Sequence, residues 1–87
     1  MATKLRIFDT FKKDYKRLPF KIKDKVDKQL EFLIKNPSHP SLSLHPICGT
    51  KGIWEGYIDY HYRFTFEIDS DFYVFRRVGT HDIIKKS

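Results

Sequence analysis

The sequence predicts a small α+β domain in which a two-helix hairpin packs on one face of a curled antiparallel sheet. Two observations support this prediction. Apolar residues recur at helical spacing in the first half of the chain, whereas aromatic and β-branched residues fill three short runs in the second half. Helices followed by a run of strands favour helices gathered on one face of a sheet. The 87 residues are enough for one domain, residues 1–87, and too few for two.

The first half predicts one strand and two helices. Residues 4–9 read KLRIFD, a short run that predicts a strand. A first helix is expected to begin at Asp9 or Thr10, because either side chain can accept hydrogen bonds from free N–H groups of the first turn. Pro19 suits the first turn of the second helix, and residues 36–37, Asn-Pro, end it. The apolar stripe of the second helix consists of Ile22, Val26, Leu30, Leu33 and Ile34.

The second half predicts three strands, at residues 54–60, 62–68 and 72–78. Residues 69–71, Asp-Ser-Asp, form a short polar segment, so the last two strands are expected to make an antiparallel hairpin. The predicted order is therefore strand, helix, helix, strand, strand, strand.

The register of this hairpin follows from its turn. If residues 69–71 form a three-residue loop, Arg63 stands directly opposite Arg77. Like charges so placed destabilise a sheet, so we expect an anion to bind between them. The face under the helices then carries Phe64, Phe66, Ile68, Phe72 and Val74, and the opposite face carries Arg63, Thr65, Glu67, Tyr73, Phe75 and Arg77.

The net charge of +6 is concentrated in the helical half. Residues 10–35 contain nine Lys or Arg and four Asp or Glu, whereas residues 42–87 contain six of each. Such a basic region attracts phosphate backbones or an acidic protein. The alternative is that these lysines only keep the helices solvated.

Cysteine usage and hydropathy predict a reduced, cytoplasmic protein. Cys48 is the one cysteine, so no intramolecular disulfide can form, and we expect its thiol to be a small buried apolar group. No apolar run approaches the length of a membrane span. Lys4 and Arg6 interrupt the apolar stretch at the start of the chain, so no signal peptide is expected.

Several histidines and cations lie in the second half: His45, Lys51, His61, Arg63, Arg77 and His81. Imidazoles and fixed cations are the groups that RNA cleavage without a metal requires. Their spacing matches no local zinc motif, although dispersed histidines can still converge on a metal. Structural or surface histidines are the other alternative.

Two segments carry a resemblance to a known family. Residues 44–61 read LHPICGTKGIWEGYIDYH and residues 75–81 read FRRVGTH. Together they resemble the YafQ-like branch of the RelE/ParE toxin superfamily. The resemblance implies a RelE-like fold and an endoribonuclease that cleaves mRNA on the ribosome, beside the 16S rRNA. It also implies neutralisation by an antitoxin protein, with no metal or other cofactor.

The resemblance also implies site residues. His45 matches the histidine of the family's H-P-L-x-G motif, and His61 matches that of its D-x-H motif. Arg77 and His81 match the arginine and the terminal histidine around G-T-H. Arg63 falls in the Y-R pattern of other RelE-like toxins, where the arginine helps to bind phosphate.

The chain departs from the YafQ-like pattern in two places. Residues 62–63, Tyr-Arg, stand where an Asp-Trp pair is expected, and residues 83–85, Ile-Ile-Lys, stand where an aromatic residue is expected. Base stacking then falls to Tyr60 or another ring. Lys51 is expected to contact the RNA backbone, and Asp82 to orient the neighbouring His81.

Two other functions compete with the nuclease. One is a ParE-like toxin that inhibits DNA gyrase by binding it, and the other is a basic nucleic-acid-binding module without toxicity. The set of three histidines and two arginines favours the enzyme, because a binding protein does not need it.

Overall fold

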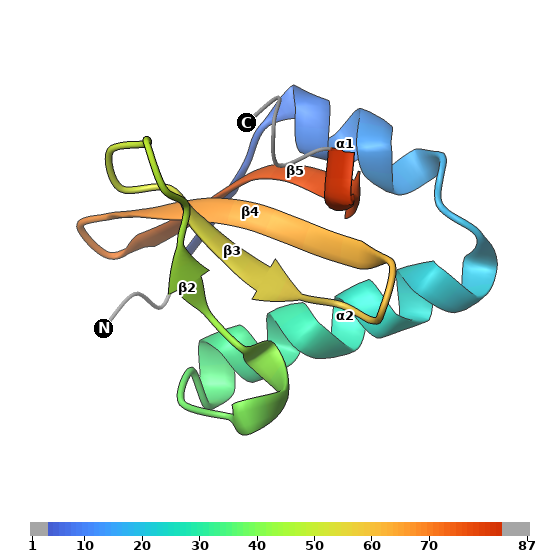
Figure 1. The fold of residues 1–87 in the computed structure, drawn as a ribbon, viewed down its shortest axis with the longest axis horizontal. Helices are drawn as coiled ribbons and strands as arrows, with labels where there is room; N and C mark the ends of the chain where they lie inside the picture. The colour runs from blue at the N-terminus through green and yellow to red at the C-terminus, as the bar shows by residue number, and fades with distance from the viewer. Residues whose placement is uncertain (1–3, 83–87) are drawn as a thin grey trace.

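Two helices pack on a five-stranded sheet in the computed structural model, which describes residues 4–82 (Figure 1). This arrangement confirms the predicted α+β class. The strand order across the sheet is β1-β5-β4-β3-β2. The elements are β1 (Lys4–Ile7), α1 (Asp9–Lys16), α2 (Phe20–Lys35), the 3-10 helix η1 (Pro40–Leu42), β2 (His45–Pro46), β3 (Trp54–Tyr57), β4 (Tyr62–Asp69) and β5 (Phe72–Thr80).

The sheet is mixed, because β1 pairs with β5 in parallel. Lys4 faces Phe72 and Ile7 faces Phe75, whereas every other pair of neighbours is antiparallel. The sequence predicted an antiparallel sheet throughout. Parallel strands need a long crossover connection, and the chain that includes α1 and α2 supplies it. β1 is consequently an edge strand, with all of its residues exposed.

The ends of α2 agree with the sequence. The carbonyl oxygen of Pro19 accepts hydrogen bonds from the N–H groups of Ile22 and Lys23, at 2.9 and 3.0 Å, and so starts the first turn. The helix ends at Lys35, directly before Asn36, as expected of a residue that precedes a proline.

Three aromatic rings form the centre of the core. The rings of Phe64, Phe66 and Phe75 lie with centroids 5.6 to 6.4 Å apart, and each side chain is almost fully buried. Val26 and Leu33 of α2 are fully buried in the same cluster. Burial of these large side chains is the main stabilising contribution in so small a domain.

The predicted hairpin register is wrong. Residues 70–71 alone form the turn, with Ser70 at φ 53°, and Asp69 pairs with Phe72. A bulge between Thr65 and Phe66 then shifts the register again. Both changes depend on backbone geometry that the residue pattern does not specify, because a bulge adds one unpaired residue to a strand.

The shifted register moves both arginines and one face of β5. Arg63 faces Gly79 and Arg77 faces Thr65, so the two arginines do not oppose each other. Tyr73 and Phe75, which were predicted on the outer face, are buried in the core. The expectation of an anion held between the two guanidinium groups therefore loses its basis.

The loop between β2 and β3 contains Cys48, whose predicted burial is wrong. Gly49 and Gly52 adopt φ values of 81° and 78°, a region that side chains rarely occupy. The loop they shape leaves Cys48 exposed, not buried as predicted.

Candidate active site

The polar side chains of β3 and β4 alternate with the buried rings and therefore share the sheet face away from the aromatic core. In the register, His45 faces Glu55, Glu55 faces Thr65 and Thr65 faces Arg77, a row that crosses four strands. The next row contains Tyr57, Arg63 and Gly79. Most of the predicted site residues thus come from one face of the sheet or from the loops at its end.

Arg63 organises the connection between β3 and β4. Its Nη1 donates hydrogen bonds to the carbonyl oxygens of Tyr62 at 2.8 Å and Tyr60 at 3.3 Å, and also to that of Asp59. The guanidinium carbon lies 4.6 Å from the centre of the Tyr57 ring. Arg63 therefore fixes the backbone that carries Tyr60 and His61.

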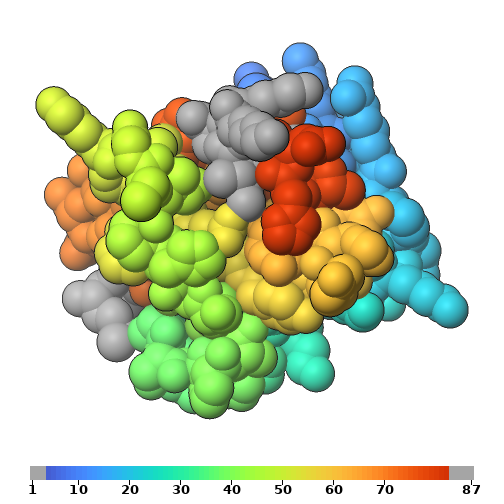
Figure 2. All heavy atoms as spheres, in the orientation of Figure 1, coloured from blue at the N-terminus to red at the C-terminus, as the bar shows by residue number. Residues whose placement is uncertain are grey.

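The same connection meets the end of β5. His81 Nε2 lies 3.4 Å from the Tyr60 carbonyl oxygen, and the Tyr60 and His61 rings meet edge to face, with centroids 4.9 Å apart. Figure 2 shows this neighbourhood, with the red atoms that follow β5 beside the gold atoms of the segment after β3. Tyr60 is 76% exposed, and His61 and His81 are exposed as well. The tertiary structure thus brings two imidazoles, a guanidinium and an exposed ring together.

Asp59 stabilises the connection between β3 and β4, and the sequence did not indicate it as a site residue. Its carboxylate accepts hydrogen bonds from the N–H groups of His61 and Tyr62, at 2.9 and 3.0 Å, and an ion pair from Lys25 at 3.2 Å. Burial raises the pKa of Asp59, but these three interactions outweigh it and leave the pKa below its ordinary value. Asp is common at this position of a turn, because its side chain can accept a hydrogen bond from the backbone N–H two residues later.

His45 contacts a second residue that the sequence analysis missed. Its Nε2 lies 2.7 Å from Oε2 of Glu55, and its Nδ1 lies 3.1 Å from the carbonyl oxygen of Ser43. The Glu55 side chain is 9% exposed, whereas that of His45 is 55% exposed. No sequence signal indicated this contact, because it depends on the register in which β2 pairs with β3, where His45 faces Glu55.

Arg77 pairs with a residue of α1, not with the connection between β3 and β4 at residues 58–61, here called the site loop. Its Nε donates to Oδ2 of Asp14 at 2.7 Å and its Nη2 donates to Oδ1 at 3.1 Å. The hydrogen bond with Asp14 raises the pKa of Arg77, so the guanidinium stays charged. The side chain is 24% exposed, and it lines an open depression with Arg17, Tyr62 and Thr80.

The remaining predicted positions lie at the surface. Lys51 lies exposed between the two loop glycines, and Asp82 follows His81, also exposed. Residues 83–85, where the family pattern has an aromatic residue, lie outside the described residues. Within residues 4–82, no three His, Cys, Asp or Glu side chains converge as metal ligands. Neither helix of that region has the length and apolar composition of a membrane span.

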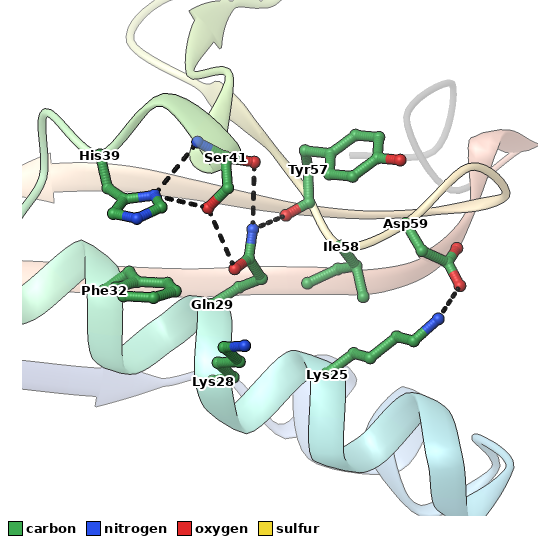
Figure 3. A pocket seen from close by; sticks show the side chains of 9 residues that line it. All are labelled: Lys25, Lys28, Gln29, Phe32, His39, Ser41, Tyr57, Ile58 and Asp59. Carbon is green, nitrogen blue, oxygen red and sulfur yellow. Dashed lines mark hydrogen bonds and ion pairs between the residues drawn. The ribbon is translucent and has the colours of Figure 1, made fainter.

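A cavity of about 410 Å³ lies beside the site loop, between α2, η1 and the end of β3 (Figure 3). Gln29 lies at its centre and donates to the carbonyl oxygens of Ser41 at 3.1 Å and Tyr57 at 2.9 Å. His39 stacks on Phe32 with centroids 4.0 Å apart and accepts a hydrogen bond from the Ser41 N–H. These contacts fix η1 against α2, so His39 has a structural role.

Comparison with known proteins gives one family and many similar structures. Residues 5–84 match the family described as the ParE toxin of type II toxin–antitoxin system, parDE. No curated protein matches the chain.

Three solved structures illustrate the shared fold. A chain of the E. coli DinJ–YafQ toxin–antitoxin complex is 20% identical, with 95% of this chain and 97% of that chain covered and a TM-score of 0.79. The RelB–RelE antitoxin–toxin complex from Methanococcus jannaschii gives 24% identity, 93% and 95% coverage and a TM-score of 0.75. The YoeB/ParE toxin from Agrobacterium tumefaciens is 18% identical, with 90% of this chain and 98% of that chain covered and a TM-score of 0.77.

Proposed function

Because the chain belongs to the ParE toxin family of type II toxin–antitoxin systems, we propose that it is a toxin that cleaves mRNA on the ribosome. One observation carries the enzymatic part of the proposal. Arg63 and His81, 18 positions apart in the chain, both contact the Tyr60 carbonyl oxygen, the His61 ring contacts the Tyr60 ring, and both imidazoles are exposed to a substrate.

This arrangement suits cleavage through the 2′-hydroxyl. The 2′-oxygen of one nucleotide attacks the adjacent phosphorus, and the bond from phosphorus to the 5′-oxygen of the next nucleotide breaks. One imidazole accepts the proton of the 2′-hydroxyl and the other donates a proton to the departing 5′-oxygen. We assign these two roles to His61 and His81, without a metal ion or other cofactor.

The cations and the exposed ring bind the RNA. Arg63 stabilises the negative charge on the phosphorus in the transition state, and Arg77 contributes through the donors that Asp14 does not occupy. Tyr60 stacks on a base, which its 76% exposure allows. Lys51 contacts the backbone, and Asp82 orients His81.

Two kinds of partner follow from this proposal. The DinJ–YafQ and RelB–RelE complexes, similar in fold, are toxin–antitoxin complexes, which supports an antitoxin partner here. The excess of nine basic over four acidic residues in positions 10–35 attracts an acidic antitoxin and the phosphates of mRNA and 16S rRNA alike. Because translated mRNA and ribosomes are cytoplasmic, the proposal includes a cytoplasmic location.

Primer extension on a reporter mRNA tests the nuclease. We expect cuts at codon-defined positions when the purified protein is added to a translating extract, and none when ribosomes are omitted. Equal cutting of naked RNA would contradict the dependence on the ribosome. The family description keeps a gyrase-binding ParE-like toxin as the second candidate, and accumulation of trapped gyrase–DNA complexes without mRNA cuts would select it.

A further inference from the structure

The imidazole of His45 lies between two hydrogen-bond acceptors. The carbonyl oxygen of Ser43, 3.1 Å from Nδ1, can only accept, and so can the ionised carboxylate of Glu55, 2.7 Å from Nε2. The Ser43 contact comes from the chain just before β2, and the Glu55 contact comes from β3. The ring is thus held from two sides while half of its surface stays open to solvent.

A neutral imidazole cannot satisfy both acceptors, because it carries one N–H and one bare nitrogen. A bare Nε2 facing a carboxylate at 2.7 Å would be repulsive. The doubly protonated ring donates a hydrogen bond to each partner. Its bond to the Glu55 carboxylate then joins two opposite charges and is stronger than a hydrogen bond between neutral groups. In the register, Glu55 faces the uncharged Thr65 on its other side.

We propose that Glu55 is a positioning residue that holds His45 as an imidazolium, so that His45 faces the substrate as a fixed cation. This inference rests on the proposed nuclease function and deepens it. His45 then stabilises negative charge on the reacting phosphate, and the exchange of protons is left to His61 and His81. Glu55 touches no substrate and acts only through His45.

Long-range ¹H–¹⁵N correlation spectra at neutral pH test the pair without any substrate. The His45 signals are assigned from their absence in His45→Gln. We expect both ring nitrogens to be protonated in the wild-type protein, and a neutral ring with its hydrogen on Nδ1 in Glu55→Gln. A wild-type ring with a bare Nε2, which a protonated Glu55 would produce, would overturn the proposal.

Cleavage of translated mRNA gives the second readout. We expect His45→Gln and Glu55→Gln each to lower the rate by about 10²–10³-fold, and the double variant to fall no further, because the two residues act as a unit. Glu31→Gln, the same change at an exposed helix position, is the matched control and leaves both readouts unchanged. A Glu55→Gln protein with full activity would overturn the proposal. A wild-type protein that cuts nothing would refute the nuclease alone, since the spectra still decide the pair.

Discussion

Asp14 of α1 and Arg77 of β5 form a bidentate ion pair, and the same carboxylate accepts a hydrogen bond from the N–H of Val78 at 3.2 Å. The location explains the pair. β1 stops pairing at Phe75, so the rest of β5 lies at an edge with unpaired backbone groups. Asp14 satisfies one of them, and Thr10 of α1 donates to the Arg76 carbonyl oxygen at 2.9 Å. The first helix thus completes the edge of the sheet.

Asp14→Asn should lower the free energy of unfolding by about 1–3 kcal/mol, because it weakens three hydrogen bonds to a nearly buried carboxylate. A thermal scan measures this as a melting temperature lower by several degrees. Asp24→Asn, an exposed aspartate of α2, is the control with little expected change. Equal melting temperatures for both variants would show that the ion pair contributes nothing to stability.

Comparison of Arg77→Gln with Asp14→Asn distinguishes the contribution of Arg77 to stability from its contribution to mRNA cleavage. Loss of the ion pair lowers stability as in Asp14→Asn, but only Arg77→Gln removes the cation from the substrate. We therefore expect similar melting temperatures for the two variants and a much lower rate of mRNA cleavage for Arg77→Gln, measured at a temperature where both are folded. Equal rates would assign Arg77 a structural role alone.

Asp59 should make the protein sensitive to acid. Its pKa lies below the ordinary value of 3.8 in the folded protein, so its stabilising contribution is fully present above about that pH. The contribution is lost as the pH falls through the lower folded value, where the carboxyl group takes up a proton. Asp59→Asn should be less stable than the wild type at neutral pH, and the difference should shrink as the pH falls below 3.8. A difference that stays the same from neutral pH to pH values below 3.8, measured by urea unfolding, would contradict the linkage.

His81→Ala should lower cleavage by about 10²–10⁴-fold, the usual contribution of a general acid or base, and leave the melting temperature unchanged. The residue is exposed, and its one described contact is a 3.4 Å approach to the Tyr60 carbonyl oxygen. His39→Ala is the opposite control: it removes the stacking on Phe32 and the contact with Ser41, so it should lower stability and spare the rate. Full activity of His81→Ala would exclude this residue from the site.

Gly56→Ala should destabilise the fold by about 1–3 kcal/mol, the usual effect of overpacking. A methyl group there would collide with the ring of Phe64, which is fully buried and cannot move aside. Chemical unfolding measures the change, and Gly56→Ala combined with Phe64→Leu should recover part of the loss. A single variant as stable as the wild type would mean that the ring has room to shift.

Local pattern was enough to locate most of the elements. The stripe of α2 and its end before Pro37 depend on neighbours a few residues apart, and so do the runs that became β3, β4 and β5. The strings around His45, His61 and His81 were also sufficient to indicate the superfamily, and the family match over residues 5–84 confirms it.

The tertiary structure alone decided which side chains meet. A two-residue turn and a bulge separate Arg63 from Arg77, and both depend on strand pairing and not on residue type. Asp14 reaches Arg77 across 63 positions, and Glu55 reaches His45 across a strand pair. Such contacts arise because burial of the aromatic core determines where the strands and helices lie, and polar groups near the sheet edges pair with the groups that this packing brings within hydrogen-bond distance.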